Sequence, residues 1–138
     1  MKLIHLQHGC IVVLVVLFTY TATSKLFAMT SFQFTLLQIP LLRPMSRVLV
    51  WLVPLFELLL VVLLLFHQTV RLGLVLSFLF LVACTAYMVY MLLYLPQMPC
   101  ACGGVIGLLS WPQHVMLNVF LLFWVVVAYC ALWISEQH

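Results

Sequence analysis

Long apolar runs separated by short polar stretches dominate this chain. A helix that crosses the ~30 Å hydrocarbon layer of a membrane needs about 20 apolar residues, and four runs meet this requirement, at 4–22, 48–66, 72–95 and 115–134. Lipid offers no hydrogen-bond partners to the backbone, and none of the runs alternates as a barrel strand does. The pattern therefore predicts an all-α integral membrane protein, a four-helix transmembrane bundle forming a single domain over 1–138.

Two segments of this pattern need separate treatment. Lys2 precedes the first run in the way that a positive charge precedes the apolar segment of a secretory signal. The run is long, however, and no A-x-A-like cleavage site ends it, so we predict a membrane span. Segment 26–39 is rich in Phe and Leu, yet polar residues interrupt it. This mixture is typical of a short helix lying in the membrane interface.

Composition and charge narrow the function classes. Hydrophobic residues make up 68% of the chain and charged residues only 5%, against about 25% charged residues in an average soluble domain. The five basic residues are scattered, so there is no basic stripe for a nucleic acid. They lie at Lys2 and Arg71 on the side of the two termini, and at Lys25, Arg43 and Arg47 on the other side. This near tie does not assign the two sides of the membrane.

The least lipid-like segment is a cysteine loop between the third and fourth runs. Cys100 and Cys102 are separated by one residue, after Pro99 and before Gly103 and Gly104. Such a pair closes a small, strained disulfide ring, which is easily reduced and therefore suits thiol exchange. The glycines permit the tight backbone that brings two sulfurs together. The alternative is a pair of inert thiols in a turn.

The three other cysteines are predicted to be structural. At 1.5 Å per residue, Cys130 lies roughly 24 Å along its helix from His114, and Cys84 is roughly 16 Å deep. Cys10 lies near the same far side as Cys130. None of them is a convincing resolving thiol, and free cysteine is a common small apolar residue in buried helices. Electrons from a reacting loop pair would go to another molecule, such as a membrane quinone or a partner protein.

His114 and Asn118 share one face at the start of the fourth run, because they are spaced i and i+4. A protonated His114 at the positive end of the helix dipole would stabilise a nearby thiolate, the form that attacks a disulfide. The alternative is that both side chains only form hydrogen bonds between helices.

Glu57 has nine residues of its run on either side, which places it close to the bilayer midplane. An unpaired carboxylate costs at least ~2.5 to 3.5 kcal/mol there, so the side chain must face inward. Either it is protonated, or it pairs with a cation, for which Lys25 is best placed. Glu57 is then a proton carrier or a ligand-binding group, or it forms a structural ion pair or hydrogen bond that holds the first two spans together.

Taken together, these residues resemble a known family. The resemblance rests on Ser24-Lys25-Leu26-Phe27, Pro54 and Glu57, the Cys100-Ala101-Cys102-Gly103-Gly104 loop, Ser110-Trp111, His114 and Asn118. In order and placement they are similar to the MauE family of methylamine-utilisation membrane proteins, within the wider DoxX-like set of bacterial four-helix membrane proteins. The family's namesake is implicated in forming the disulfides of the methylamine dehydrogenase small subunit in the periplasm. The resemblance thus implies a multi-pass protein of the bacterial inner membrane, with cytoplasmic termini and a periplasmic cysteine loop.

The leading hypothesis is a membrane thiol/disulfide redox protein, possessing a cysteine pair that exchanges electrons with an exported or periplasmic partner. Its predicted residues fall into three groups: Cys100, Cys102 and His114 for the chemistry; Lys25, Glu57 and Asn118 for a ligand or proton site; and Pro99, Gly103 and Gly104 for the loop geometry. A quinone is compatible with the aromatic and aliphatic surface of the bundle, although no sequence signature indicates one.

Two other functions remain open. Met98, Cys100, Cys102, His114 and Met116 are soft or imidazole ligands of the kind that select Cu(I), although repeated Met motifs are missing. Alternatively, the protein is a non-catalytic subunit or assembly factor in a membrane complex, for which the uncharged apolar stretch 105–109 would form part of the contact surface.

Overall fold

A computed structural model describes residues 2–38, 40, 42–94 and 111–137, and all regular structure within these ranges is helical. The elements are α1 (Lys2–Phe27), α2 (Met29–Gln38), the short 3-10 turn η1 (Arg43–Met45), α3 (Ser46–Leu65), α4 (Val70–Tyr94) and α5 (Trp111–Gln137). Of these, α1, α4, α5 and η1 with α3 are long and apolar enough to cross a membrane. The predicted all-α architecture with four membrane spans is confirmed.

Each long helix begins before the apolar run that predicted it, and α1 and α5 also end after their runs. α1 continues through the polar residues after residue 22 and ends at Phe27. Its threonine hydroxyls bond to the helix's own backbone, since Thr23 Oγ1 donates to the carbonyl of Thr19 at 2.7 Å and Thr21 Oγ1 to that of Phe18 at 3.3 Å. A hydroxyl satisfied in this way can remain inside an apolar helix. The short helix predicted over 26–39 is accordingly α2, which starts later because α1 occupies the first residues of that segment.

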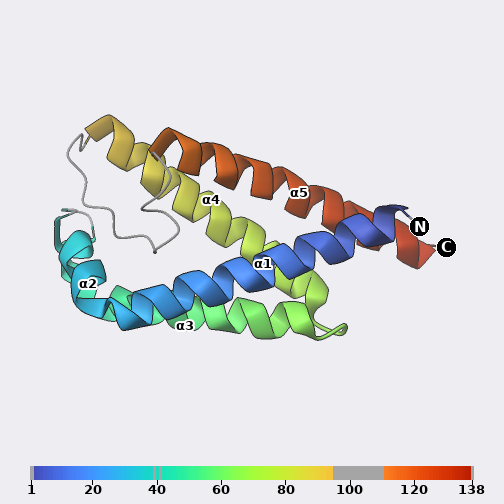
Figure 1. Cartoon of the computed structure of the whole chain (residues 1–138), viewed down its shortest axis with the longest axis horizontal. Coiled ribbons are helices and arrows are strands. Elements are labelled where there is room, and N and C mark those ends of the chain that lie inside the picture. The colour runs from blue at the N-terminus through green and yellow to red at the C-terminus, as the bar shows by residue number, and fades with distance from the viewer. Residues whose placement is uncertain (1, 39, 41, 95–110, 138) are drawn as a thin grey trace.

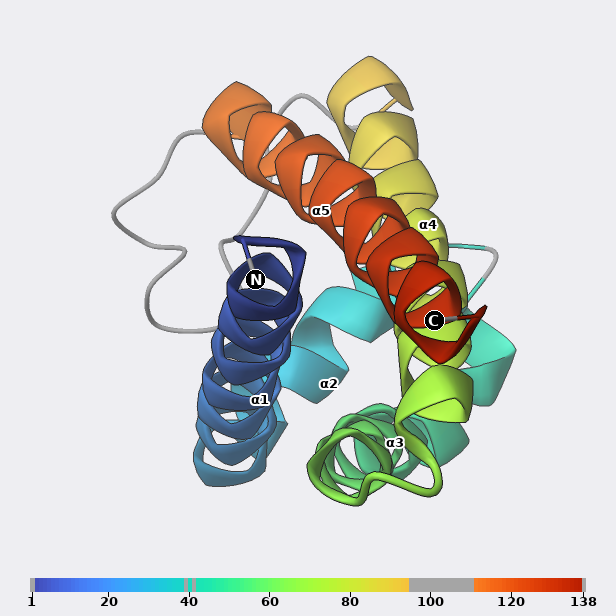
Figure 2. The same ribbon diagram turned by 90° about the vertical axis from the view of Figure 1, so that its right-hand side faces the viewer.

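The four long helices run alternately up and down (Figure 1). Both termini and the α3–α4 turn lie at one end, which we call the terminal end, and α2 lies at the opposite end (Figures 1 and 2). α1 packs along α3 and α4 packs along α5, while contacts of α1 with α5 and of α3 with α4 complete the bundle. The connection between α4 and α5 therefore begins and ends at the α2 end.

A small packed cluster at the α2 end joins Phe32 and Leu36 of α2 to Val50 of α3. The main packed core occupies the half of the bundle toward the terminal end. Its buried members are Cys10, Leu14, Phe18, Leu60, Leu64, Val70, Leu74, Leu81, Leu121, Val125, Ala128 and Leu132. Large apolar side chains also cover the outside, such as Val62, Leu79 and Phe123, which are all exposed. An apolar outer surface on this scale is that of a protein surrounded by lipid.

Polar contacts join the helices at the terminal end. The indole nitrogen of Trp124 donates to the carbonyl of Leu6 at 3.2 Å and so connects α5 to α1. Arg71 at the start of α4 pairs with Glu136 near the end of α5, and both side chains are about half exposed. These contacts connect α5 to both α1 and α4 at the terminal end.

Gly73 allows α4 to approach α3 closely just after their turn. A Cβ at this position would lie 3.1 Å from Leu64 Cδ2 and 3.2 Å from the carbonyl carbon of Leu63, which as backbone cannot rotate away. We expect Gly73→Ala to lower the free energy of unfolding in detergent by about 1 to 3 kcal/mol, the usual cost of overpacking. Gly9→Ala is the matched control, since its Cβ would lie at an ordinary 3.4 Å from Trp124. Equal stability of the two variants would contradict the close approach.

Candidate functional site

A cavity of about 310 Å³ lies inside the α2 end of the bundle. This is the half of the bundle that the main packed core does not fill, and toward this end α4 and α5 separate from α1 and α3 (Figure 1). The walls come from α1, α2, α3, α4, α5 and the segment before η1. They are Leu17, Phe18, Thr21, Lys25, Phe32, Leu36, Leu42, Leu49, Val53, Glu57, Phe80, Leu81, Ala83, Cys84, Tyr87, Met88, His114, Leu117 and Asn118. A largely apolar cavity with a few converging polar groups is the usual form of a small-molecule site.

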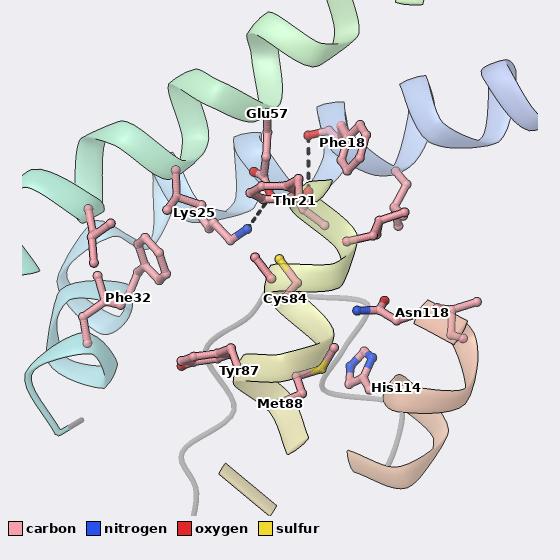
Figure 3. A pocket seen from close by; sticks show the side chains of 18 of the residues that line it. Phe18, Thr21, Lys25, Phe32, Glu57, Cys84, Tyr87, Met88, His114 and Asn118 are labelled. Atoms are coloured by element: carbon pink, nitrogen blue, oxygen red, sulfur yellow. Dashed lines mark hydrogen bonds and ion pairs between the residues drawn. The ribbon is translucent and has the colours of Figure 1, made fainter. Parts of the chain in front are cut away.

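The most polar part of the wall is an ion pair between α1 and α3. Lys25 Nζ donates to Glu57 Oε1 at 2.6 Å, and both side chains are buried (Figure 3). Glu57 lies about 16 Å along α3 from Ser46 at 1.5 Å per residue, which is deep in its span. Of the two answers predicted for its burial, the structure has the pairing with Lys25. The pair removes most of the cost of two isolated charges, but it does not by itself assign a function.

The ion pair leaves part of the hydrogen-bonding capacity of Lys25 and Glu57 unused. An ammonium group has three N–H donors, and within the described ranges Glu57 Oε1 is the acceptor that Lys25 Nζ contacts. Glu57 Oε2 is buried and has no hydrogen-bond partner among the residues that the structure describes. A buried carboxylate oxygen normally accepts hydrogen bonds, and the residue that carries this one lines the cavity.

α2 completes this side of the cavity. The ring of Phe32 is buried, and its centroid lies 5.8 Å from Lys25 Nζ. An ammonium group at this distance from an aromatic ring gains a cation–π attraction. Leu36, one turn further along α2, is also buried and also lines the cavity. The predicted interfacial helix therefore has a second role, because it covers the charged group of the cavity with an aromatic face.

His114 and Asn118 line the cavity from α5 and are both buried. Their i, i+4 spacing places them on the same face, as predicted, and that face points inward. Figure 3 shows them on the far side of the cavity from Lys25 and Glu57, past the α4 segment that carries Cys84 and Tyr87. The cavity thus has a charged pair at one place and two polar side chains at another, and most of its remaining wall is apolar.

The structure brings together four of the predicted site residues: Lys25, Glu57, His114 and Asn118. The rest of the predicted site, namely Cys100, Cys102, Pro99, Gly103 and Gly104, lies outside the described residues, as do Met98 and the stretch 105–109. For the Cu(I) hypothesis, Met116 is 71% exposed whereas His114 is 2% exposed, so their side chains lie on different faces of α5. No group of three or more His, Cys, Asp or Glu residues suited to a metal ion occurs in the described ranges.

Several cavity residues were not predicted as site residues. Cys84, treated as a structural thiol, lies in the cavity wall, whereas Cys10 is buried in the core and Cys130 is exposed. Thr21 precedes Lys25 by one helical turn, and Tyr87 follows Cys84 on the same face of α4. Helical spacing from an already identified residue was the available signal for Thr21. No residue of α4 was predicted as a site residue, so helical spacing could not be used to find Cys84 or Tyr87.

Comparison with known proteins agrees with this architecture. A family profile described as "Methylamine utilisation protein MauE" matches residues 3–133 of the 138. Searches among curated proteins and among solved structures found no match. The matched range extends from the start of α1 to the last turns of α5 and so includes all four apolar helices. The chain therefore belongs to the MauE family, as a membrane protein with four apolar helices.

Proposed function

We propose that this protein is a membrane thiol/disulfide redox protein in which Cys100 and Cys102 exchange electrons with an exported or periplasmic thiol-containing partner. The observation that carries the proposal is the position of the cysteine pair in the chain. It lies between Tyr94, the last residue of α4, and Trp111, the first residue of α5, and both helices line the cavity close to these ends.

Chain length supports a connection between the cysteines and the cavity. Cys100 follows Tyr94 by six residues, and an extended chain spans at most ~3.3 to 3.6 Å per residue, so its Cα is tethered within about 20 Å of the end of α4. His114 lies one turn into α5. In this proposal His114 favours the thiolate form of a cysteine, while Pro99, Gly103 and Gly104 shape the loop.

The exchange itself is a balanced two-electron step. A partner thiolate attacks one sulfur of the Cys100–Cys102 disulfide, and the S–S bond breaks to give a mixed disulfide and one free thiolate. A second partner thiolate then attacks the partner's own sulfur in the mixed disulfide. The partner leaves with a disulfide, and Cys100 and Cys102 are left as a dithiol that carries the two electrons.

In this proposal the loop lies on the periplasmic side of the bacterial inner membrane, and the termini lie in the cytoplasm. The resemblance to the MauE family supports this orientation, because its namesake is implicated in forming disulfides in the periplasm, and disulfides form and persist in an oxidising compartment. Lys25, Glu57 and Asn118 form the ligand or proton site of the same protein.

Differential alkylation in intact cells tests the proposal. A thiol reagent that cannot cross the inner membrane is applied before and after reduction, and labelled peptides are identified by mass spectrometry. We expect Cys100 and Cys102 to be labelled from outside, with labelling that rises after reduction, because part of the population holds the disulfide. Cys10 is the internal control, since it is buried in the core and should stay unlabelled.

The opposite pattern would refute the proposal. If Cys100 and Cys102 react only after the cells are permeabilised, and if reduction leaves their labelling unchanged, then the pair is a reduced cytoplasmic dithiol. A Cys100→Ser/Cys102→Ser double variant measured in parallel identifies the signal that belongs to the loop.

A further inference from the structure

We propose that the cavity at the α2 end of the bundle binds a quinone, a lipid-soluble molecule with a flat ring and two opposite carbonyl oxygens. The first argument is size and lining. The cavity volume of about 310 Å³ lies at the lower end of the range of small-molecule sites. Its walls are mainly aliphatic and aromatic, as a ring with a hydrocarbon tail requires.

Two residues of the cavity wall also reach the outer surface of the bundle. Ala83 on α4 and Leu117 on α5 line the cavity, and both are exposed. The outer surface of the bundle is covered by large apolar side chains and faces hydrocarbon. Part of the cavity wall therefore borders hydrocarbon, which suits a ligand dissolved in the membrane.

Charge favours a neutral ligand. Lys25 and Glu57 form a 2.6 Å ion pair whose formal charges cancel. An anion such as a fatty-acid carboxylate or a phosphate would be attracted by Lys25 but repelled by the adjacent Glu57. A cation would be attracted by Glu57 but repelled by Lys25. A neutral molecule with hydrogen-bonding oxygens meets neither penalty.

The ion pair offers partners to both redox forms of a quinone. A carbonyl oxygen of the oxidised form accepts a hydrogen bond from Lys25 Nζ, which has N–H donors beyond the one directed at Glu57. A hydroxyl of the reduced form has an acceptor in the Glu57 carboxylate, one oxygen of which has no partner in the described part of the chain. Asn118 lines the cavity across from this pair (Figure 3), and its amide is the candidate partner for the second oxygen of the ring.

The inference rests on the proposed function for the source of the electrons. The Cys100–Cys102 dithiol loses two S–H bonds and gains one S–S bond. The two electrons and two protons that it releases convert the two carbonyl oxygens of the quinone to hydroxyls. The quinone is thus the acceptor that returns the cysteine pair to its disulfide form.

Photolabelling of the purified full-length protein in lipid nanodiscs tests the binding site. An azido-benzoquinone is the label, and decylubiquinone, a short-chain benzoquinone, is the competitor. We expect saturable labelling of peptides from the cavity walls that decylubiquinone removes. The Lys25→Met/Glu57→Leu variant removes the charged pair as a unit, and it should bind about tenfold more weakly or worse, because one hydrogen bond to a charged group is lost.

A pair of alanines on α4 provides a second, matched comparison. Ala83 lines the cavity, whereas Ala86 is exposed on the same helix outside the cavity lining. Ala83→Phe fills the cavity and should reduce competed labelling by about tenfold or more, while Ala86→Phe should leave it unchanged. Equal labelling in the two variants overturns the proposal, and so does a co-purified phospholipid that decylubiquinone does not displace.

The Cys100→Ser/Cys102→Ser variant separates this inference from the proposed function. It should retain competed labelling, because the cavity is built from other residues. If the wild type binds decylubiquinone but the loop cysteines never change redox state, the proposed function fails and the binding site stands. If the cysteines turn over but no quinone competes for the cavity, the binding site is refuted.

Discussion

Lys25→Met is expected to lower the free energy of unfolding of the bundle by about 3 to 5 kcal/mol, the typical cost of removing one partner from a buried ion pair. The substitution keeps most of the side-chain length but leaves Glu57 buried in the span without its cation. The carboxyl group then has to take up a proton or draw water into the cavity, and either change costs free energy. Unfolding by denaturant in mixed micelles measures the loss.

Two comparison variants show whether the loss comes from the unpaired charge. Lys25→Met combined with Glu57→Leu removes both charges and should recover most of the stability, because an apolar replacement of a buried pair is often close to neutral. Arg71→Met breaks the half-exposed pair with Glu136 and should change stability by only about 0 to 1 kcal/mol. If the double variant were as unstable as Lys25→Met alone, packing of the Lys25 side chain rather than charge would explain the effect.

Cys100→Ser and Cys102→Ser are each expected to abolish oxidation of partner thiols. A single remaining cysteine cannot form the intramolecular disulfide, and without a disulfide there is no sulfur for a partner thiolate to attack. Loss of either sulfur should therefore remove the whole activity rather than half of it. The measurement is the redox state of exported thiol proteins in cells that carry each variant, together with a search for mixed disulfides on non-reducing gels.

Cys130→Ser is the matched control for these variants. Cys130 is an exposed cysteine of α5 toward the terminal end, far along the helix from the cavity. Its replacement should leave the oxidation of partners unchanged. Normal oxidation in both Cys100→Ser and Cys102→Ser would contradict the redox function and would favour a protein that only docks a partner.

Much of the architecture can be predicted from the amino-acid sequence. Four runs of about 20 apolar residues require four helices, since lipid leaves the backbone no other hydrogen-bond partners. One midspan carboxylate, Glu57, required an inward position and a partner, and Lys25 was the best-placed cation. The i, i+4 spacing of His114 and Asn118 required a shared face. The family could be identified from the order of these motifs, and the profile match over 3–133 confirms it.

Other features depended on the packing of the helices against one another. The helices are apolar on nearly all sides, so the pattern that separates a buried face from an exposed face in a soluble helix is weak here. For this reason the sequence alone indicated neither the cavity nor Cys84 and Phe32 in its walls. Hydrocarbon accepts an apolar side chain as readily as a protein core does. Only the tertiary structure decides which apolar residues face lipid, which fill the core and which surround the cavity.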